Sequence, residues 1–140
     1  MTDSSKPPVS HDSTHETGAF GAHVGLQITS WELNRVELDL QVEAFHLNRG
    51  QVLHGGMTST LADAACGYAG THPDMPEGQR QAVTLSLNVQ FIEPGQPGRR
   101  ITAIGEKVGG GRSIFFSRCD VRDESGALLA QAEGTFRYVG

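Results

Sequence analysis

The sequence predicts an α+β domain in which a curved antiparallel β-sheet wraps around one central α-helix. Residues 56–70 contain no proline and place apolar side chains at helical spacing, which indicates that helix. Alternation of apolar and polar residues marks strands on both sides of it, within 26–45 and 83–139. The 140 residues, 37% of them hydrophobic, suffice for one core but not comfortably for two.

The N-terminal region differs in composition from the rest. Residues 1–17 are polar, contain Pro and Ser, and lack apolar periodicity, so we expect a disordered tail followed by one domain over 18–140. Residues 17–25 are expected to form a short helical turn that is capped by Thr17 and directs Phe20 at the domain. The N-terminal histidines have no accompanying Cys or carboxylate cluster, and we expect no bound metal.

The first strands are expected between residues 26 and 45. Within 36–43, valine and leucine alternate with Glu, Asp and Gln, which is typical of a strand with one dry face. Residues 27–33 are expected to precede this strand or pair with it. The turn at 48–50 then leads to the helix. There Asn48 has three open roles, namely capping, positioning the turn or orienting a substrate, and the sequence alone favours the turn.

The helix at 56–70 has two unlike faces. One is apolar and is expected to pack on the sheet. The other collects small residues around one carboxylate, Asp63, where a solvent-exposed helix would carry Lys, Glu or Gln. Such a face suits close approach of a ligand or backbone, but periodicity leaves open whether Asp63 reacts or only hydrogen-bonds a neighbour. The apolar stripe comprises Met57, Leu61, Ala64, Ala65 and Tyr68, and the small face Gly56, Thr60, Asp63, Gly67 and Gly70.

Two glycines stand at the start of this helix, in the run His54-Gly55-Gly56. Unpaired N–H groups and the positive end of the helix dipole can receive a carbonyl oxygen or an oxyanion there. A general base together with an oxyanion site is the equipment of acyl transfer, and Asp63 follows on the same helix. Without Asp63, the two glycines would indicate only a permissive turn.

Residues 83–91 are expected to form the clearest strand, with its large apolar residues on one face. The polar face either meets solvent, as in many antiparallel sheets, or lines an interface or tunnel where Thr84 and Ser86 hold a water or an amide. A turn cluster rich in Pro and Gly separates this strand from the last three. Those strands are expected near 99–108, 112–122 and 127–139.

The run Gly109-Gly110-Gly111-Arg112-Ser113 joins two of these strands. The N–H groups of consecutive glycines, next to an arginine, can contact amide and phosphate groups of a ligand. Taken alone, however, a loop of this composition is only a flexible hairpin, so the run becomes a binding prediction only in the context of the whole chain.

The net charge of −5 and the pI near 5.6 disfavour nucleic acid and anionic membranes as partners, although a local basic patch can still bind a phosphorylated ligand. No apolar run approaches membrane-spanning length, and the first residues have no hydrophobic signal core, so we expect a soluble cytoplasmic protein. Cys66 and Cys119 lack metal or redox spacing and are expected to be free, buried thiols.

The pattern formed by Asn48, His54-Gly55-Gly56 and Ala62-Asp63 resembles the acyl-CoA thioesterases of the phenylacetate-degradation (PaaI) type, in the hotdog-fold superfamily. The likeness extends over about residues 18–140 and is most specific in the stretch from Asn48 to Asp63. It implies association into a homodimer or, as a dimer of dimers, a homotetramer, with the site between subunits.

This resemblance implies hydrolysis of an acyl-CoA with an aryl, phenylacetyl-type or medium-chain acyl group, and no cofactor, because CoA is part of the substrate. It makes Asp63 the general base or nucleophile and the Gly55 N–H the oxyanion donor. Thr84 would orient the water or Asp63, and His54 and Asn48 have supporting roles that the sequence does not separate. The other residues expected to contact the substrate or its CoA are Gly56, Ser86, Phe91, Gly109, Gly110, Gly111, Arg112 and Ser113.

Two alternatives stay open at this point. A Cys66 nucleophile assisted by His54 would be a different enzyme, but a carboxylate one helical turn away disfavours the thiolate. A hotdog module that binds acyl-CoA without turnover would be a different class of protein, and the presence of Asp63 beside the two glycines counts against it. Release of free thiol from an acyl-CoA distinguishes turnover from binding.

Overall fold

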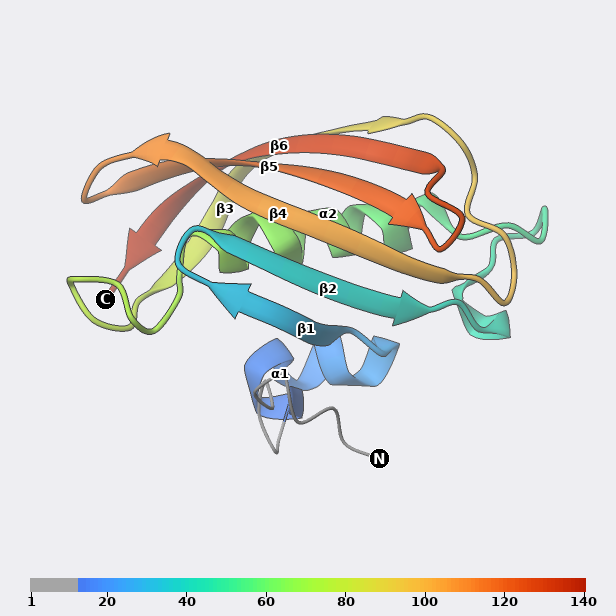
Figure 1. Cartoon of the computed structure of the whole chain (residues 1–140), viewed down its shortest axis with the longest axis horizontal. Coiled ribbons are helices and arrows are strands. Elements are labelled where there is room, and N and C mark those ends of the chain that lie inside the picture. Colours follow the sequence, from blue (N-terminus) through green and yellow to red (C-terminus); the bar gives the residue numbers. More distant parts are fainter. Residues whose placement is uncertain (1–12) are drawn as a thin grey trace.

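The computed structural model describes residues 13–140 and shows one six-stranded sheet curved around a helix (Figure 1). The strands lie in the order β1-β2-β4-β5-β6-β3, and all neighbouring pairs are antiparallel. The predicted α+β architecture is confirmed. The elements are α1 (Ser13–Val24), β1 (Gln27–Glu32), β2 (Arg35–Gln41), the 3-10 turn η1 (Ala44–His46), α2 (Gly55–Ala69), β3 (Gln81–Phe91), β4 (Arg100–Gly110), β5 (Ile114–Asp123) and β6 (Leu128–Val139).

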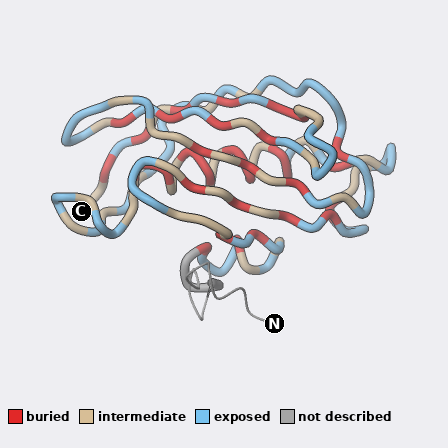
Figure 2. Tube along the Cα trace, in the orientation of Figure 1, coloured by how far each residue is buried: buried red, intermediate tan, exposed pale blue. Residues whose placement is uncertain are grey.

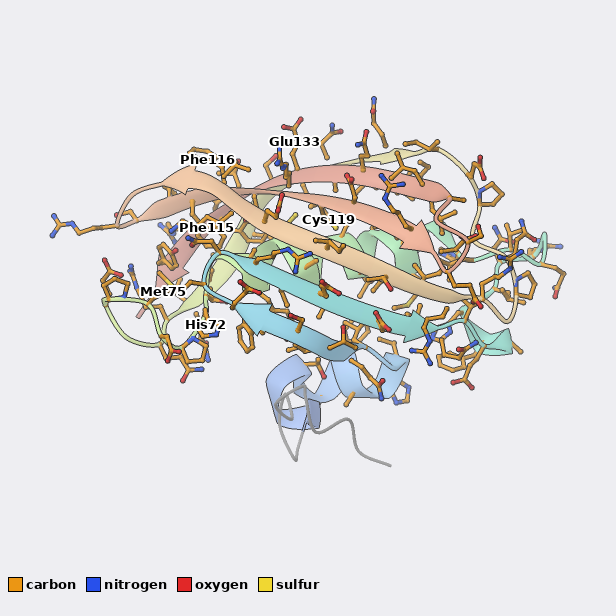
Figure 3. All side chains as sticks on the ribbon, in the orientation of Figure 1. His72, Met75, Phe115, Phe116, Cys119 and Glu133 are labelled. Atoms are coloured by element: carbon orange, nitrogen blue, oxygen red, sulfur yellow. The ribbon has the colours of Figure 1, made fainter. Side chains whose placement is uncertain are left out.

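The core lies between the inner face of the sheet and α2, where the buried segments of Figure 2 gather. On β2 the valine and leucine side chains are buried and the acidic residues between them are not, as the alternation predicts. β5 follows the same rule. Phe115 and Cys119 are buried, whereas Phe116 is exposed and lies on the outer side of the sheet together with Glu133 of β6 (Figure 3).

Small residues bring α2 very close to the sheet. A Cβ on Gly105 of β4 would overlap the backbone carbonyl of Ala65, so this contact requires glycine. Leu61 supplies a large fully buried side chain on the helix, and most of its neighbours in the contact are Ala or Cys. The buried residues of α2 are Met57, Thr58, Leu61, Ala62, Ala65, Cys66 and Ala69.

This buried set corrects the predicted faces of α2. Ala64 and Tyr68 were expected to pack on the sheet, but both are only half-buried, because Ala62, Cys66 and their neighbours turn toward the sheet instead. Gly70 was expected on the open, small face. It is buried, and a Cβ there would overlap the Phe115 ring. The apolar stripe is therefore rotated about the helix axis relative to the prediction.

β3 is an edge strand that pairs with β6 alone within residues 13–140. The register between the two strands shifts by one residue between Thr84 and Ser86, which is a β-bulge. The prediction of one uninterrupted apolar face over 83–91 is therefore wrong. Val83 and Leu85, before and within the bulge, are 44% and 54% exposed, whereas the apolar residues that pack on the core are Ala82, Leu87 and Val89.

α1 lies beside β1 and begins earlier than the predicted turn (Figure 1). It starts at Ser13 and is kinked at Gly18, whose φ of 75° favours glycine. Phe20, expected to face the domain, is 64% exposed, because the segment packs through the buried residues Gly21 and Leu26.

The other predictions for the N-terminal region fall largely on residues 1–12, which lie outside the described part of the chain. The disordered tail and the domain boundary at residue 18 therefore stay predictions. None of the helices within residues 13–140 has the length and apolar character needed to cross a membrane.

Candidate active site

Asn48 closes the turn that leads to α2. Its Oδ1 accepts hydrogen bonds from the N–H groups of Gly50 (2.8 Å) and Val52 (3.2 Å), and its own N–H donates to the Val52 carbonyl (2.8 Å). Gln51 between them has a φ of 64°, in the left-handed region. Two N–H groups of the turn thus occupy the amide oxygen, and of the three roles open for Asn48 the geometry favours positioning the turn.

His54 caps the start of α2. Its backbone is extended (φ −61°, ψ 132°), and its Nδ1 accepts the Gly56 N–H at 2.8 Å. A Cβ on Gly56 would lie 2.9 Å from that nitrogen, so the cap requires glycine there. The Gly55 N–H, in contrast, has no acceptor among residues 13–140. The helix start therefore leaves the Gly55 N–H as an available donor at the positive end of the dipole.

The Phe91 ring lies beside this donor. A Cβ on Gly55 would be 3.5 Å from Phe91 Cε1, an ordinary van der Waals distance. Phe91 is the last residue of β3, and its ring is largely exposed. The ring thus forms an apolar wall next to the Gly55 N–H. A substrate group bound to that N–H would contact the Phe91 ring.

Asp63 and Thr84 meet on the open side of α2. The Thr84 hydroxyl donates a 2.7 Å hydrogen bond to Asp63 Oδ1. Asp63 lies in the middle of the half-buried side of α2. The β-bulge after Thr84 determines on which face of β3 the Thr84 hydroxyl lies. A hydrogen bond between a hydroxyl and a carboxylate fixes the orientation of the carboxylate group. Ser86 follows the bulge and is exposed, and it does not line the cleft that holds Asp63.

Asp63 and Thr84 line a cleft of about 630 Å³ on the open side of α2. Ala64, Gly67 and Tyr68 line it from the helix, which explains why these residues are only half-buried. A volume of this size is typical of small-molecule sites. The further lining residues are Thr17, Gly18, Trp31, Thr71, Pro73, Gln79, Arg80, Gln81, Ala82 and Phe136.

Trp31 builds one wall of the cleft by packing on the helix. Its Nε1 donates to the Tyr68 carbonyl (3.0 Å), and its ring meets the Tyr68 ring edge-on, with centroids 5.3 Å apart. His72 also packs against Trp31, with ring centroids 5.3 Å apart, and its side chain is only 14% exposed. The edge-on contact with Trp31 covers it, in the loop that also carries Met75 (Figure 3).

The glycine hairpin between β4 and β5 lies near the far end of the cleft. Gly110 has a φ of 138°, which favours glycine, and the Gly111 N–H closes the turn on the Ile114 carbonyl (2.8 Å). The Arg112 carbonyl accepts a 2.8 Å hydrogen bond from Nη1 of Arg80, which lines the cleft. Arg80 is a site residue that sequence reasoning missed, because it stands in a breaker-rich connection without periodicity.

Gly55 and Asp63 of one chain do not meet. Asp63 stands eight positions after Gly55 on the helix, which corresponds to a rise of about 12 Å. Attack on a thioester carbon and stabilisation of its oxygen require the acting groups to lie within about 3 Å of the reacting atoms. The helix start, with Gly55 and Phe91, and the cleft, with Asp63 and Thr84, are therefore two separate half-sites within one chain.

Cys66 faces away from the cleft. It is fully buried between α2 and the sheet, as is Cys119 of β5. A hydrogen bond with Cys66 and burial together raise the pKa of the Cys119 thiol far above its ordinary value. Neither thiol can reach a ligand in the cleft, so the geometry gives no support to a Cys66 nucleophile. Among residues 13–140, no three His, Cys, Asp or Glu side chains gather as metal ligands.

Comparison with known proteins adds to this geometry. A profile of the family described as the thioesterase superfamily matches residues 50–130. Acyl-coenzyme A thioesterase 13 of Mus musculus is 28% identical over 98 residues, which cover 69% of this chain and 68% of that protein. Acyl-coenzyme A thioesterase PaaI of Escherichia coli is 25% identical over 126 residues, covering 90% and 86%.

A solved structure has the same arrangement of elements. It is a mutant form of the phenylacetic acid degradation protein PaaI from Thermus thermophilus, which superposes with a TM-score of 0.77 at 28% sequence identity. The superposition covers 87% of this chain and 100% of that chain. The similarity therefore extends over most of the fold.

Proposed function

Because this chain belongs to the thioesterase superfamily, as a PaaI-type thioester hydrolase with the hotdog fold, we propose that it hydrolyses an acyl-CoA to a free acid and CoA. The observation that carries the proposal is the hydrogen bond from Thr84 to Asp63 in a cleft large enough for an acyl group. The acyl groups that we propose are aryl, phenylacetyl-type or medium-chain, and CoA enters as part of the substrate rather than as a cofactor.

In the proposed mechanism, Asp63 acts on the thioester carbon in one of two ways. As a general base it takes a proton from a water, whose oxygen attacks the carbon; as a nucleophile it attacks directly, and water hydrolyses the resulting anhydride. The negative charge that develops on the thioester oxygen is stabilised by the Gly55 N–H. Collapse of the tetrahedral intermediate then expels the CoA thiolate, which takes up a proton.

The separation of the two half-sites supports a homodimer as the working form. β3 is an edge strand with exposed Val83 and Leu85, and an unpaired edge of this kind favours addition of a further strand. Antiparallel pairing of two β3 strands sets the end of one beside the start of the other. The Gly55 N–H of one subunit would thereby approach Asp63 of the second. Two such dimers would form the proposed homotetramer.

The remaining predicted residues take roles that follow from their contacts. His54 occupies the Gly56 N–H and so leaves the neighbouring Gly55 N–H for the substrate, and Asn48 holds the turn before it. Phe91 provides an apolar wall at the helix start. We propose that the hairpin at 109–113 contacts the CoA arm, through its glycine N–H groups and Arg112. A contact by Ser86 stays a prediction.

The decisive experiment is release of free thiol from phenylacetyl-, benzoyl- and hexanoyl-CoA by the native protein and by Asp63→Asn. Loss of the general base should lower kcat by about 10²–10⁴-fold, with CoA binding retained. Cys66→Ser is the matched control on the same helix, and it should keep its activity because its side chain faces the core. If the native protein binds CoA but turns over none of the three, the non-catalytic acyl-CoA module is the correct function.

A further inference from the structure

The cleft extends well beyond Asp63, along α2 toward Thr71 and the loop before β3. Among the described residues that line it, Asp63 and Arg80 alone carry a formal charge. The first is a carboxylate in the proposed reaction, whereas the second takes no part in it. The cleft therefore has a negative end at Asp63, where the thioester must lie in the proposed reaction. Its positive group is Arg80, and the neighbouring elements show where Arg80 lies.

Two independent paths place Arg80 at the far end of the cleft. Arg80 directly precedes β3 and stands four positions before Thr84, which corresponds to about 13 Å of extended chain. Across the sheet, Arg80 lies over the Tyr138 ring, and the Tyr138 hydroxyl donates to the Gly70 carbonyl at 2.7 Å. Gly70 follows Asp63 by seven helical residues, or about 10 Å. Both paths separate Arg80 from Asp63 by about 10 Å or more along the cleft.

The contacts of Arg80 orient its guanidinium without neutralising it. Cζ lies 4.1 Å from the centroid of the Tyr138 ring, and Nη1 donates to the Arg112 carbonyl at 2.8 Å. No acidic side chain pairs with Arg80 in the part of the chain that the structure describes. The arginines that do pair with acidic side chains are Arg35, Arg99, Arg100, Arg118 and Arg122.

We propose that Arg80 binds an anionic group of the substrate at the far end of this cleft, an inference that rests on the proposed thioesterase function. A planar guanidinium that is stacked and held on one side presents its remaining N–H groups as a fork for a carboxylate or a phosphate. The negative charge of Asp63 repels such a group from the other end, so the two charges together set the direction in which the substrate lies.

Two parts of the substrate carry this chemistry. One is a carboxylate at the end of the acyl chain, in which case the acyl group fills the cleft. The other is a phosphate of CoA, in which case the pantetheine arm fills it and the hairpin at 109–113 lies next to the same anion. The aromatic walls of Trp31 and Tyr68 suit either an acyl chain or the alkyl part of pantetheine, so substrate pairs must distinguish the two.

The test compares kcat and KM of the native protein with those of Arg80→Gln and Arg80→Met. Both variants remove the positive charge, and the methionine variant keeps an unbranched side chain over the Tyr138 ring. If one variant does not fold, the other still tests the role of the charge. The matched control is Arg118→Gln, an arginine on the outer face of the sheet that pairs with Glu106. Thermal unfolding verifies that each variant is folded.

The substrates are hexanoyl-, octanoyl- and decanoyl-CoA, their carboxylated counterparts adipoyl-, suberoyl- and sebacoyl-CoA, and the octanoyl thioester of N-acetylcysteamine, which lacks phosphate. If the acyl carboxylate binds Arg80, its loss raises KM about tenfold or more for the carboxylated thioesters alone. If a CoA phosphate binds, KM rises equally for all CoA thioesters and stays unchanged for the N-acetylcysteamine thioester.

Unchanged kinetics of the Arg80 variants on every substrate would overturn the inference, and so would an equal loss on all thioesters, including the one without phosphate. A failure of the proposed function looks different. In that case the native protein itself releases no thiol from any of the seven substrates, and the comparison of Arg80 variants is replaced by binding of CoA and of the free dicarboxylic acids.

Discussion

Replacing Gly55 by proline should remove the proposed oxyanion donor and leave the fold intact. Proline has no N–H, and the first helical position tolerates it because the N–H there has no partner within the helix. The residue before a proline must be extended, and His54 already has a ψ of 132°. Gly55→Ala is the matched control, because it adds a Cβ 3.5 Å from the Phe91 ring but keeps the N–H.

The expected magnitude follows from these contacts. Loss of one oxyanion donor costs about 10²–10³-fold in kcat, or about 2.7–4 kcal/mol of transition-state stabilisation. The alanine variant adds only an ordinary van der Waals contact, and alanine is favoured over glycine in a helix by about 0.5–1 kcal/mol. Because Gly55→Ala retains the N–H and the fold, its kcat should stay within a few-fold of the native value. Because the Gly55 N–H has no acceptor within residues 13–140, the proline variant should lose no hydrogen bond of the described fold.

Thiol release from phenylacetyl-CoA measures kcat and KM of the native protein and both variants, and circular dichroism with thermal unfolding shows whether each is folded. A folded proline variant whose kcat stays within about threefold of the alanine variant would refute the role of the Gly55 N–H. An equal, large loss in both variants would instead assign the effect to crowding at Phe91, because the alanine variant retains the donor.

Substitutions at three further positions test other parts of the structure. Thr84→Val should lower kcat by about 10–100-fold through loss of a hydrogen bond to a charged group, and Thr84→Ser should restore most of it; equal activity of all three proteins would contradict the orienting role. Gly105→Ala should destabilise the fold by about 1–3 kcal/mol in urea unfolding, because its Cβ overlaps the Ala65 carbonyl. His46→Ala should cost about 1–3 kcal/mol in the same measurement, because the buried ring bonds the Glu43 N–H and the Val24 carbonyl, and an unchanged midpoint would exclude that contribution.

The parts of the site that depend on local chemistry are predictable from the sequence. A histidine followed by two glycines indicates a capped helix start because the cap needs only residues two positions apart. Asp63 stands out because its helical neighbours on one face are small, and that face does open into the cleft.

The parts that depend on distant partners are not predictable in this way. The register shift in β3 arises from its pairing with β6, and the unbroken alternation of 83–91 gives no sign of it. The rotation of α2 depends on how closely Gly105 lets the helix approach, which is a property of another strand. Arg80 has no periodic neighbours, and its importance emerges only from the Tyr138 ring beneath it.

The β-bulge breaks the alternation of side chains along β3, so that even-numbered positions face α2 before it and odd-numbered positions face α2 after it. Before the bulge, the side chains at positions 82 and 84 face α2, and after the bulge those at positions 87 and 89 do. Substitutions in the first half can therefore change the lining of the cleft without changing the hydrophobic packing of the second half. A change of length acts differently. Deleting Leu85 would remove the extra residue and join the two halves in one regular alternation, with Thr84 still facing Asp63 and with Leu87 and Val89 still on the core. Loss of one residue at the bulge should therefore be tolerated, whereas loss of one residue elsewhere in β3 would turn part of the strand to the opposite face.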